Sequence, residues 1–293
     1  MTKEPKEVTV ADAQPFLKWA GGKYSLAPQL HPLMPKDLGQ RRYVEPFLGS
    51  GGMFFWLRAR GFIGMGVLSD RLRGLIKAFK AVRDAPDVLV AMLQTHQEKH
   101  NDEYYAARRA QYNAPAPEVK IECELAALFI YLNKTCFNGL YRENARGKFN
   151  VPIGSYKNPA ICDRSKVYSA SLALQSAGLF NDPYNQRVIY DSDFLYLDPP
   201  YAPTSATSNF TSYSGVWRPE EQIQLRGWLR ELDQRGVPWM LSNSDTPGMR
   251  ELYADCDIQT VSARRSISEK SSTRGKVNEL VIRNLQHWPR GAL

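Results

Sequence analysis

The chain has 293 residues, 43% of them hydrophobic, which is enough for a substantial core in one large domain or two ordinary ones. Lys and Arg number 38 against 30 Asp and Glu, and the resulting formal charge of +8 favours a polyanionic partner. The four cysteines lie far apart without a C-x-x-C pair, so they predict neither a zinc site nor a disulfide framework and fit a reducing cytoplasm. Because the amino terminus is charged and the longest apolar run, residues 125–132, is short, we expect no signal peptide and no membrane segment.

Residues 1–14 are expected to form a disordered leader. The next stretch, residues 15–23, places aromatic and cationic side chains around the pair Gly21-Gly22, which permits tight backbone geometry. An ordinary turn leading into a helix is the alternative interpretation of this stretch.

Residues 43–57 predict a strand, a glycine-rich turn and a helix, the first half of a nucleotide-binding βαβ unit. The turn carries Glu45, Phe47, Gly49 and Gly51. The third glycine of the dinucleotide fingerprint is missing, since Phe54 occupies its position, and the Glu45 carboxylate would repel a pyrophosphate.

Asp70 ends the next predicted strand, residues 62–69, about 20 residues after the glycines, where a carboxylate meets ribose hydroxyls. A positively charged nucleoside cofactor without phosphates, such as S-adenosylmethionine, therefore fits better than NAD. A purely structural turn remains the alternative.

Helical periodicity follows over residues 75–112 and again over 119–134, with a Pro-containing break at 113–117. His96 and His100 lie four residues apart, but the intervening Gln-Glu-Lys does not match H-E-x-x-H, so a wet helical face is expected there and no metal site.

Residues 133–157 mix cations, amides, aromatics and glycines. A hairpin turning at residues 145–147 would carry Arg142 and Tyr156 toward a groove of nucleic acid, where a guanidinium can bind guanine O6 and N7. Lys134, Lys148 and Lys157 are candidate phosphate ligands. A solvated basic hairpin is the alternative.

After a helical patch near residues 169–177, the apolar run 194–197 leads directly into Asp198-Pro199-Pro200-Tyr201. Since proline cannot donate to a sheet ladder, this pattern predicts a buried strand whose carboxyl end presents an acid. The carboxyl edge of an α/β sheet is where ligands bind, and an acid, exposed carbonyls and a flat ring suit a planar amino-bearing substrate. A mere strand end with a capping Asp is the alternative.

The remaining sequence predicts a polar flap over residues 201–210, a helix over 219–232, a strand at 239–241 and a strand pair at 258–263 and 279–283. The last pair brackets a second cationic loop at residues 264–276.

Six collinear motifs between residues 15 and 285 together resemble the Dam-type DNA adenine-N6 methyltransferases of the α-group, also called the D12 class. They are Phe16-Leu17-Lys18-Trp19-Ala20-Gly21-Gly22-Lys23, Glu45-Pro46-Phe47-x-Gly49-x-Gly51, Asn138-Gly139-Leu140-x-Arg142, Asp198-Pro199-Pro200-Tyr201-Ala202-Pro203, Asn209-Phe210-Thr211 and Arg264-Arg265-Ser266-Ile267-Ser268.

The resemblance implies a role for each matched residue. The catalytic tetrapeptide is Asp198, Pro199, Pro200 and Tyr201. The S-adenosylmethionine-binding residues are Trp19, Lys23, Glu45, Phe47, Gly49, Gly51, Asp70 and Asp198. The residues assigned to DNA are Lys18, Asn138, Leu140, Arg142, Pro152, Tyr156 and Lys157, with the arginine reading guanine in GATC. No metal is implied.

The implied fold is a Rossmann-like α/β methyltransferase sheet with helices on both faces, residues 15–75 and 169–293, with an inserted mainly helical target-recognition domain carrying a β-hairpin, residues 76–168. The implied reaction is methyl transfer from S-adenosylmethionine to N6 of an adenine flipped out of double-stranded DNA. We expect a monomer, with a dimer on DNA as the alternative. Three other functions stay open: methylation of cytosine N4 or RNA, methylation of a protein glutamine, and DNA binding by an inactive homologue.

Overall fold

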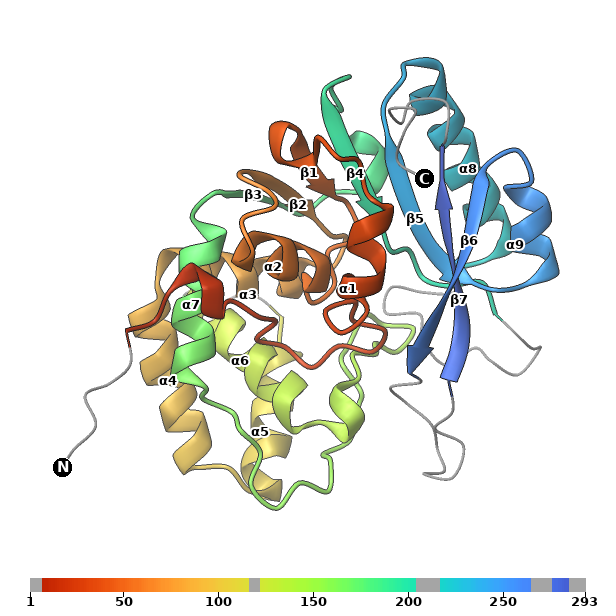
Figure 1. Cartoon of the computed structure of the whole chain (residues 1–293). Coiled ribbons are helices and arrows are strands. Elements are labelled where there is room, and N and C mark those ends of the chain that lie inside the picture. Colours follow the sequence, from red (N-terminus) through yellow and green to blue (C-terminus); the bar gives the residue numbers. More distant parts are fainter. Residues whose placement is uncertain (1–6, 116–121, 204–216, 265–275, 285–293) are drawn as a thin grey trace.

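The computed structural model describes residues 7–115, 122–203, 217–264 and 276–284 (Figure 1). These residues contain a seven-stranded sheet in the order β3-β2-β1-β4-β5-β7-β6. Its strands are β1 Arg42–Glu45, β2 Gly66–Ser69, β3 Ala177–Phe180, β4 Asp193–Leu197, β5 Trp239–Ser244, β6 Asp257–Arg264 and β7 Lys276–Arg283.

Strands β1 to β5 run parallel, and β7 lies antiparallel between β5 and β6. The strand order reverses between the neighbours β1 and β4, which makes the carboxyl ends of these two strands the place where a ligand binds in such sheets. The predicted Rossmann-like sheet is confirmed.

The helices lie before and between the strands in chain order. They are η1 Val10–Asp12, α1 Ala27–Leu30, η2 His31–Leu33, η3 Leu38–Gln40, α2 Gly52–Ala59, α3 Arg73–Asp84, α4 Pro86–Glu98, α5 Asp102–Tyr112, α6 Glu122–Thr135, η4 Phe137–Gly139, α7 Arg164–Leu174, η5 Tyr184–Gln186, α8 Pro219–Gln234 and α9 Pro247–Leu252.

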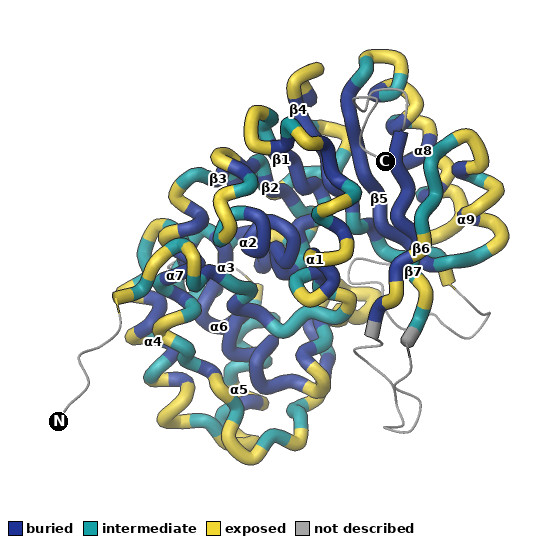
Figure 2. The backbone as a smooth tube through the Cα atoms, in the orientation of Figure 1, coloured by how far each residue is buried: buried dark blue, intermediate teal, exposed yellow. Residues whose placement is uncertain are grey.

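The sheet is covered on both faces, and its central strands β4 and β5 are buried along their whole length (Figure 2). Along β4, Phe194 and Tyr196 join the hydrophobic cluster that includes α2, α3 and α7, while Leu195 and Leu197 join the cluster formed with α8 and α9. Successive side chains of a strand point to opposite faces, so this alternation assigns the two helix groups to opposite sides of the sheet.

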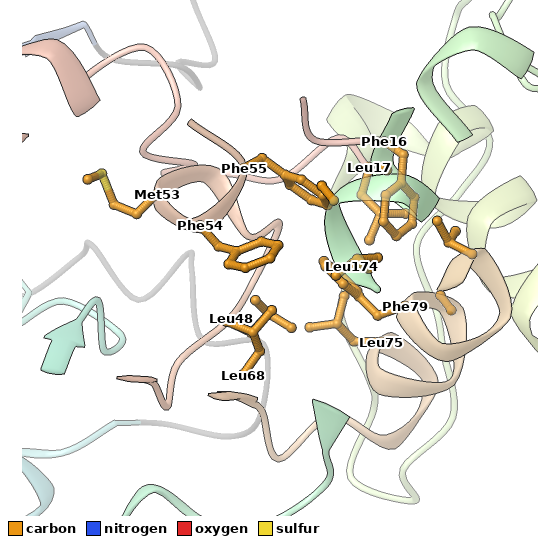
Figure 3. Close-up of a cluster of buried hydrophobic side chains, with 14 of the residues drawn as sticks. Phe16, Leu17, Leu48, Met53, Phe54, Phe55, Leu68, Leu75, Phe79 and Leu174 are labelled. Atoms are coloured by element: carbon orange, nitrogen blue, oxygen red, sulfur yellow. The ribbon is translucent and has the colours of Figure 1, made fainter. Parts of the chain in front are cut away.

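The larger cluster has an aromatic centre. The Phe16 ring packs on Phe79 of α3 with centroids 4.8 Å apart, and Phe55 of α2 stacks on Phe79 at 6.0 Å (Figure 3). This packing fixes the segment that precedes Lys18 and Trp19 against the helices beneath the sheet edge.

The same cluster continues without a break into the buried faces of α4 and α6. Leu89 and Leu93 of α4 and Phe129 and Leu132 of α6 share it with the sheet residues Tyr43 and Phe194. The helical segment and the sheet thus share one core, and the division at residue 76, which would cut α3, stays a prediction.

Several predicted boundaries differ from the structure. The helical pattern of residues 75–112 forms three helices, because Pro86 begins α4 and the Asn101 side chain caps α5 by accepting a hydrogen bond from Tyr104 N at 2.7 Å. Strand β3 and helix α9 were not predicted.

The amino-terminal expectation is wrong for part of the leader. Residues 10–12 form η1 and Ala13 is fully buried, so this stretch packs on the core. Residues 1–6, the predicted flap beyond Pro203 and most of the cationic loop at 264–276 lie outside the described residues.

Candidate active site

Asp198 follows β4 directly and lies at the predicted carboxyl edge. Its carboxylate forms an ion pair with Lys23, whose Nζ lies 2.8 Å from Oδ1 and 2.9 Å from Oδ2. The same ammonium donates to the Gly21 carbonyl at 2.6 Å, and the Lys23 side chain is only 5% exposed. Burial raises the pKa of Asp198, and the Lys23 charge opposes that rise.

The tetrapeptide is held from β5 and α8. Gln222 Nε2 donates to the Pro200 carbonyl at 3.0 Å, and Ala202 N donates to Asn243 Oδ1 at 3.0 Å. The Pro199 carbonyl receives no hydrogen bond from any described residue. Of the two proline carbonyls, that of Pro199 is therefore the one available to an amine beside Asp198.

Tyr201 is anchored at its hydroxyl, which donates to Glu279 Oε2 on β7 at 2.7 Å. Lys23 Nζ lies 4.8 Å from the centre of the Tyr201 ring and 3.9 Å from Glu279 Oε2. The structure thus brings together Lys23, Asp198 and Tyr201, which the sequence had assigned, and adds Glu279, which it had not.

The glycine loop after β1 turns as predicted. Gly49 and Gly51 have φ values of 48° and 66°, in the left-handed region that favours glycine. A Cβ at Gly49 would lie 2.7 Å from Trp19 Nε1, so the Trp19 indole lies directly against the loop.

Asp70 supports this loop after β2. Its Oδ2 accepts from Gly49 N at 3.1 Å and its Oδ1 from Leu72 N at 2.9 Å. Burial raises the pKa of Asp70, and these two hydrogen bonds oppose the rise.

Glu45 lies beneath the loop, 2% exposed, where its Oε2 accepts from Tyr43 OH at 2.8 Å and from Phe54 N at 3.2 Å. Burial raises its pKa to about 8, so the side chain is largely neutral at pH 7. It caps the start of α2, and we assign it to the support of the loop instead of direct contact with a cofactor.

Phe47 belongs to an aromatic group beside this edge. Its ring stacks on Tyr184 at 5.3 Å and meets Trp217 edge-on at 5.7 Å. Nearby, Asp182 Oδ1 and Trp217 Nε1 are buried without a hydrogen-bond partner among the described residues. The sequence interpretation missed Asp182, Tyr184 and Trp217, because they lie in connecting segments without a motif.

The predicted hairpin turn at residues 145–147 is confirmed by antiparallel bridges between Glu143 and Phe149 and between Cys136 and Ile153. Arg142 and Lys157 are exposed, and Arg142 Nε donates to Asn150 Oδ1 at 2.8 Å. Pro152 is also exposed and Leu140 is half-buried.

Lys18 joins the hairpin to the amino-terminal segment. Its Nζ lies 3.6 Å from the centre of the Tyr156 ring and donates to the Lys134 carbonyl at 2.8 Å. Asn138 has φ 54°, and the neighbouring Gly139 is packed so tightly that a Cβ there would lie 2.4 Å from Lys18 Cβ. Lys134, a candidate phosphate ligand by sequence, is instead buried, and burial lowers its pKa to about 8.

The expectation of a wet face at His96 is wrong. The His96 ring stacks on Tyr131 at 4.9 Å, and its Nδ1 lies 2.8 Å from Tyr104 OH. His100 Nδ1 lies 3.0 Å from Tyr131 OH. Within the described ranges, no three His, Cys, Asp or Glu side chains gather to hold a metal ion, and no helix is long and apolar enough to cross a membrane.

Comparison with known proteins identifies relatives over almost the whole chain. A type II methyltransferase of Lactococcus lactis subsp. cremoris is 39% identical, over 92% of this chain and 95% of that protein. A type II methyltransferase of Methanocaldococcus jannaschii is 35% identical over 93% and 99%, and the DNA adenine methylase of Escherichia coli is 36% identical over 91% and 93%.

The family model described as D12 class N6 adenine-specific DNA methyltransferase matches residues 19–267, which include the glycine loop, the hairpin and the tetrapeptide. This match agrees with the names of the relatives and excludes the cytosine, RNA and glutamine alternatives as the family reaction. The chain therefore belongs to the D12 class of N6 adenine-specific DNA methyltransferases, enzymes that methylate adenine in DNA.

Proposed function

We propose that this enzyme transfers a methyl group from S-adenosylmethionine to N6 of an adenine flipped out of double-stranded DNA, within the sequence GATC. The observation that carries the proposal is the Asp198–Lys23 pair at the carboxyl end of β4, beside the Pro199 carbonyl, which accepts no hydrogen bond from the described residues.

The residues around the glycine loop fit S-adenosylmethionine. Asp182 Oδ1 and Trp217 Nε1 are buried polar atoms that lack a partner among the described residues, and Phe47 and Tyr184 offer aromatic faces for a nucleoside base. Asp70 retains lone pairs for ribose hydroxyls beyond its two backbone contacts.

Charge also favours this cofactor. Asp198 and Glu279 carry two negative charges against the single positive charge of Lys23, so the site attracts a cation. When bound, S-adenosylmethionine supplies an electrophilic methyl group on a positively charged sulfur.

The exocyclic amine of adenine is a poor nucleophile because its lone pair is delocalised into the ring. Hydrogen bonds from this amine to the Asp198 carboxylate and the Pro199 carbonyl would localise the lone pair and stabilise the positive charge that develops on nitrogen. Burial of the site strengthens these interactions, and the tetrapeptide is already held in place by Gln222 and Asn243, so little reorganisation is needed.

The target adenine must leave the duplex to reach Asp198, and the Tyr201 ring offers a face on which it stacks. For sequence reading, the exposed Arg142 guanidinium of the hairpin is proposed to bind a guanine of GATC, with Lys18, Asn138, Leu140, Pro152 and Tyr156 contacting the rest of the site and Lys157 a phosphate. We further propose that the enzyme acts on this substrate in the cytoplasm and as a monomer.

The direct test offers the enzyme and methyl-labelled S-adenosylmethionine three substrates of equal length: a GATC duplex, a duplex with the site scrambled, and the corresponding RNA. We expect label in N6-methyladenine of the GATC duplex alone. Label in RNA would contradict the proposed DNA substrate, and label in cytosine would contradict adenine as the target base. Equal label in both duplexes would contradict GATC as the recognition site.

A further inference from the structure

Glu279 lies in the site although no motif includes it. It sits on β7, paired with Ser244 at the carboxyl end of β5, because the antiparallel β7 brings its early residues to the edge where the parallel strands end. Its side chain is 18% exposed. The two side chains that it approaches, Tyr201 at 2.7 Å and Lys23 at 3.9 Å, both belong to the proposed methyl-transfer centre.

The contact with Tyr201 fixes an aromatic ring at its far end. Hydrogen bonds of the tetrapeptide backbone and of Ala202 hold the near end, and the Tyr201 hydroxyl is tied to Glu279 Oε2. Without that tie, the ring would be free to turn about its side-chain bonds, and a base stacked on it would lose a fixed position.

The contact with Lys23 concerns charge. The Lys23 ammonium lies within hydrogen-bond distance of both Asp198 oxygens, which are also the oxygens that an adenine amine needs. Glu279 is the second carboxylate within ion-pair distance of that ammonium. It therefore offers Lys23 another partner when a substrate amine occupies Asp198.

We propose that Glu279 is a positioning residue for methyl transfer: it fixes the Tyr201 ring for the target base and shares Lys23, so that Asp198 accepts the adenine amine. This inference rests on the proposed function.

The test compares Glu279→Gln, which removes the charge and leaves the Tyr201 hydroxyl only a weaker, neutral acceptor, with Tyr201→Phe, which keeps the ring but removes the hydroxyl, and with the double variant. Glu231→Gln on the exposed face of α8 is the matched control. We expect Glu279→Gln to lower the single-turnover methylation rate about 10- to 100-fold while the Kd for DNA stays within about twofold. The fluorescence of an adenine analogue at the target position should show a less fixed base.

Two further readouts separate positioning from a structural role. Because the Glu279 charge raises the pKa of Asp198, Glu279→Gln should move the acid limb of the rate profile to lower pH. In the Tyr201→Phe background, Glu279→Gln should lower the methylation rate by a smaller factor than it does in the wild type. A wild-type rate in Glu279→Gln, or a loss that is additive with Tyr201→Phe and leaves the acid limb unmoved, would overturn the inference.

The two hypotheses fail differently. Absence of adenine methylation by the wild-type enzyme would contradict the proposed function, whereas an active wild type with an equally active Glu279→Gln variant would contradict only the inference about Glu279. Thermal unfolding followed by circular dichroism checks that each variant is folded.

Discussion

Lys23 is the residue on which the ionisation of the site depends most directly. Its ammonium is the closest positive charge to Asp198, and burial alone would favour the protonated carboxylic acid. Replacing it leaves a buried carboxylate without its ion pair, so the pKa of Asp198 rises. We expect Lys23→Met to lower the methylation rate at neutral pH and to shift the acid limb of its pH profile upward. The control Lys99→Met removes the same charge from an exposed position, and equal profiles for the two variants would contradict this role.

The conformation of the glycine loop depends on the absence of a side chain at Gly49. Gly49→Ala strains a left-handed backbone by about 1 kcal/mol and also drives a methyl group into the Trp19 indole. Gly61 has the same backbone region, with φ 71°, but open space around it. We expect both variants to lose similar backbone stability, and only Gly49→Ala to lose S-adenosylmethionine binding in calorimetry. Equal cofactor affinity in the two variants would argue against the loop as the cofactor site.

At the scale of the element, the hairpin combines a residue proposed to read a base with one proposed to hold a phosphate. We expect Arg142→Ala to weaken the binding free energy for the GATC duplex by about 1 to 3 kcal/mol, and that for a scrambled duplex by much less. Lys157→Ala should weaken binding to both duplexes about equally and reduce the salt dependence. Affinities measured by fluorescence anisotropy at several salt concentrations distinguish the two. Equal losses on both duplexes for Arg142→Ala would mark it as a phosphate ligand.

The packing of α4, α5 and α6 around His96 predicts a dependence of stability on pH. Burial lowers the pKa of His96 from 6.5 to about 4. Between these values the unfolded chain binds a proton that the folded chain does not, so the stability that His96 contributes is fully present above pH 6.5 and is lost progressively as the pH drops toward 4.

We expect His96→Phe, which keeps the stacking on Tyr131, to show a smaller loss of Tm between pH 7 and 5 than the wild type. His100→Phe, at a more exposed position, is the control and should change the pH dependence less. An unchanged pH dependence in His96→Phe would contradict the assignment.

Elements with a strong local signal were predictable from the sequence. The apolar run before Asp198 could only be a buried strand ending at the two prolines, and β4 has these bounds to within one residue. The glycine loop and the hairpin turn were predictable for the same reason, since glycines mark both. His96 was placed on a wet face wrongly because its burial comes from Tyr131 of α6, more than thirty residues away in the chain.

At the scale of the whole molecule, topology determines what the sequence could not show. Glu279 lies 78 residues from Tyr201, and the insertion of β7 between β5 and β6 brings the two together. Tyr184 reaches Phe47 of the glycine loop in the same way, because it follows β3, which lies beside β2. A sequence motif identifies a side chain whose role is evident from the residues next to it in the chain. The positions of these residues depend instead on the order of the strands in the sheet.

The central claim is that Asp198 activates an adenine amine in duplex DNA. The most direct test compares wild-type enzyme with Asp198→Ala by mass spectrometry of nucleosides from a GATC duplex after incubation with S-adenosylmethionine, together with the Kd of each protein for that duplex. We predict N6-methyladenine with the wild type, none with Asp198→Ala, and similar DNA affinity. Wild-type-like product from Asp198→Ala would contradict the account.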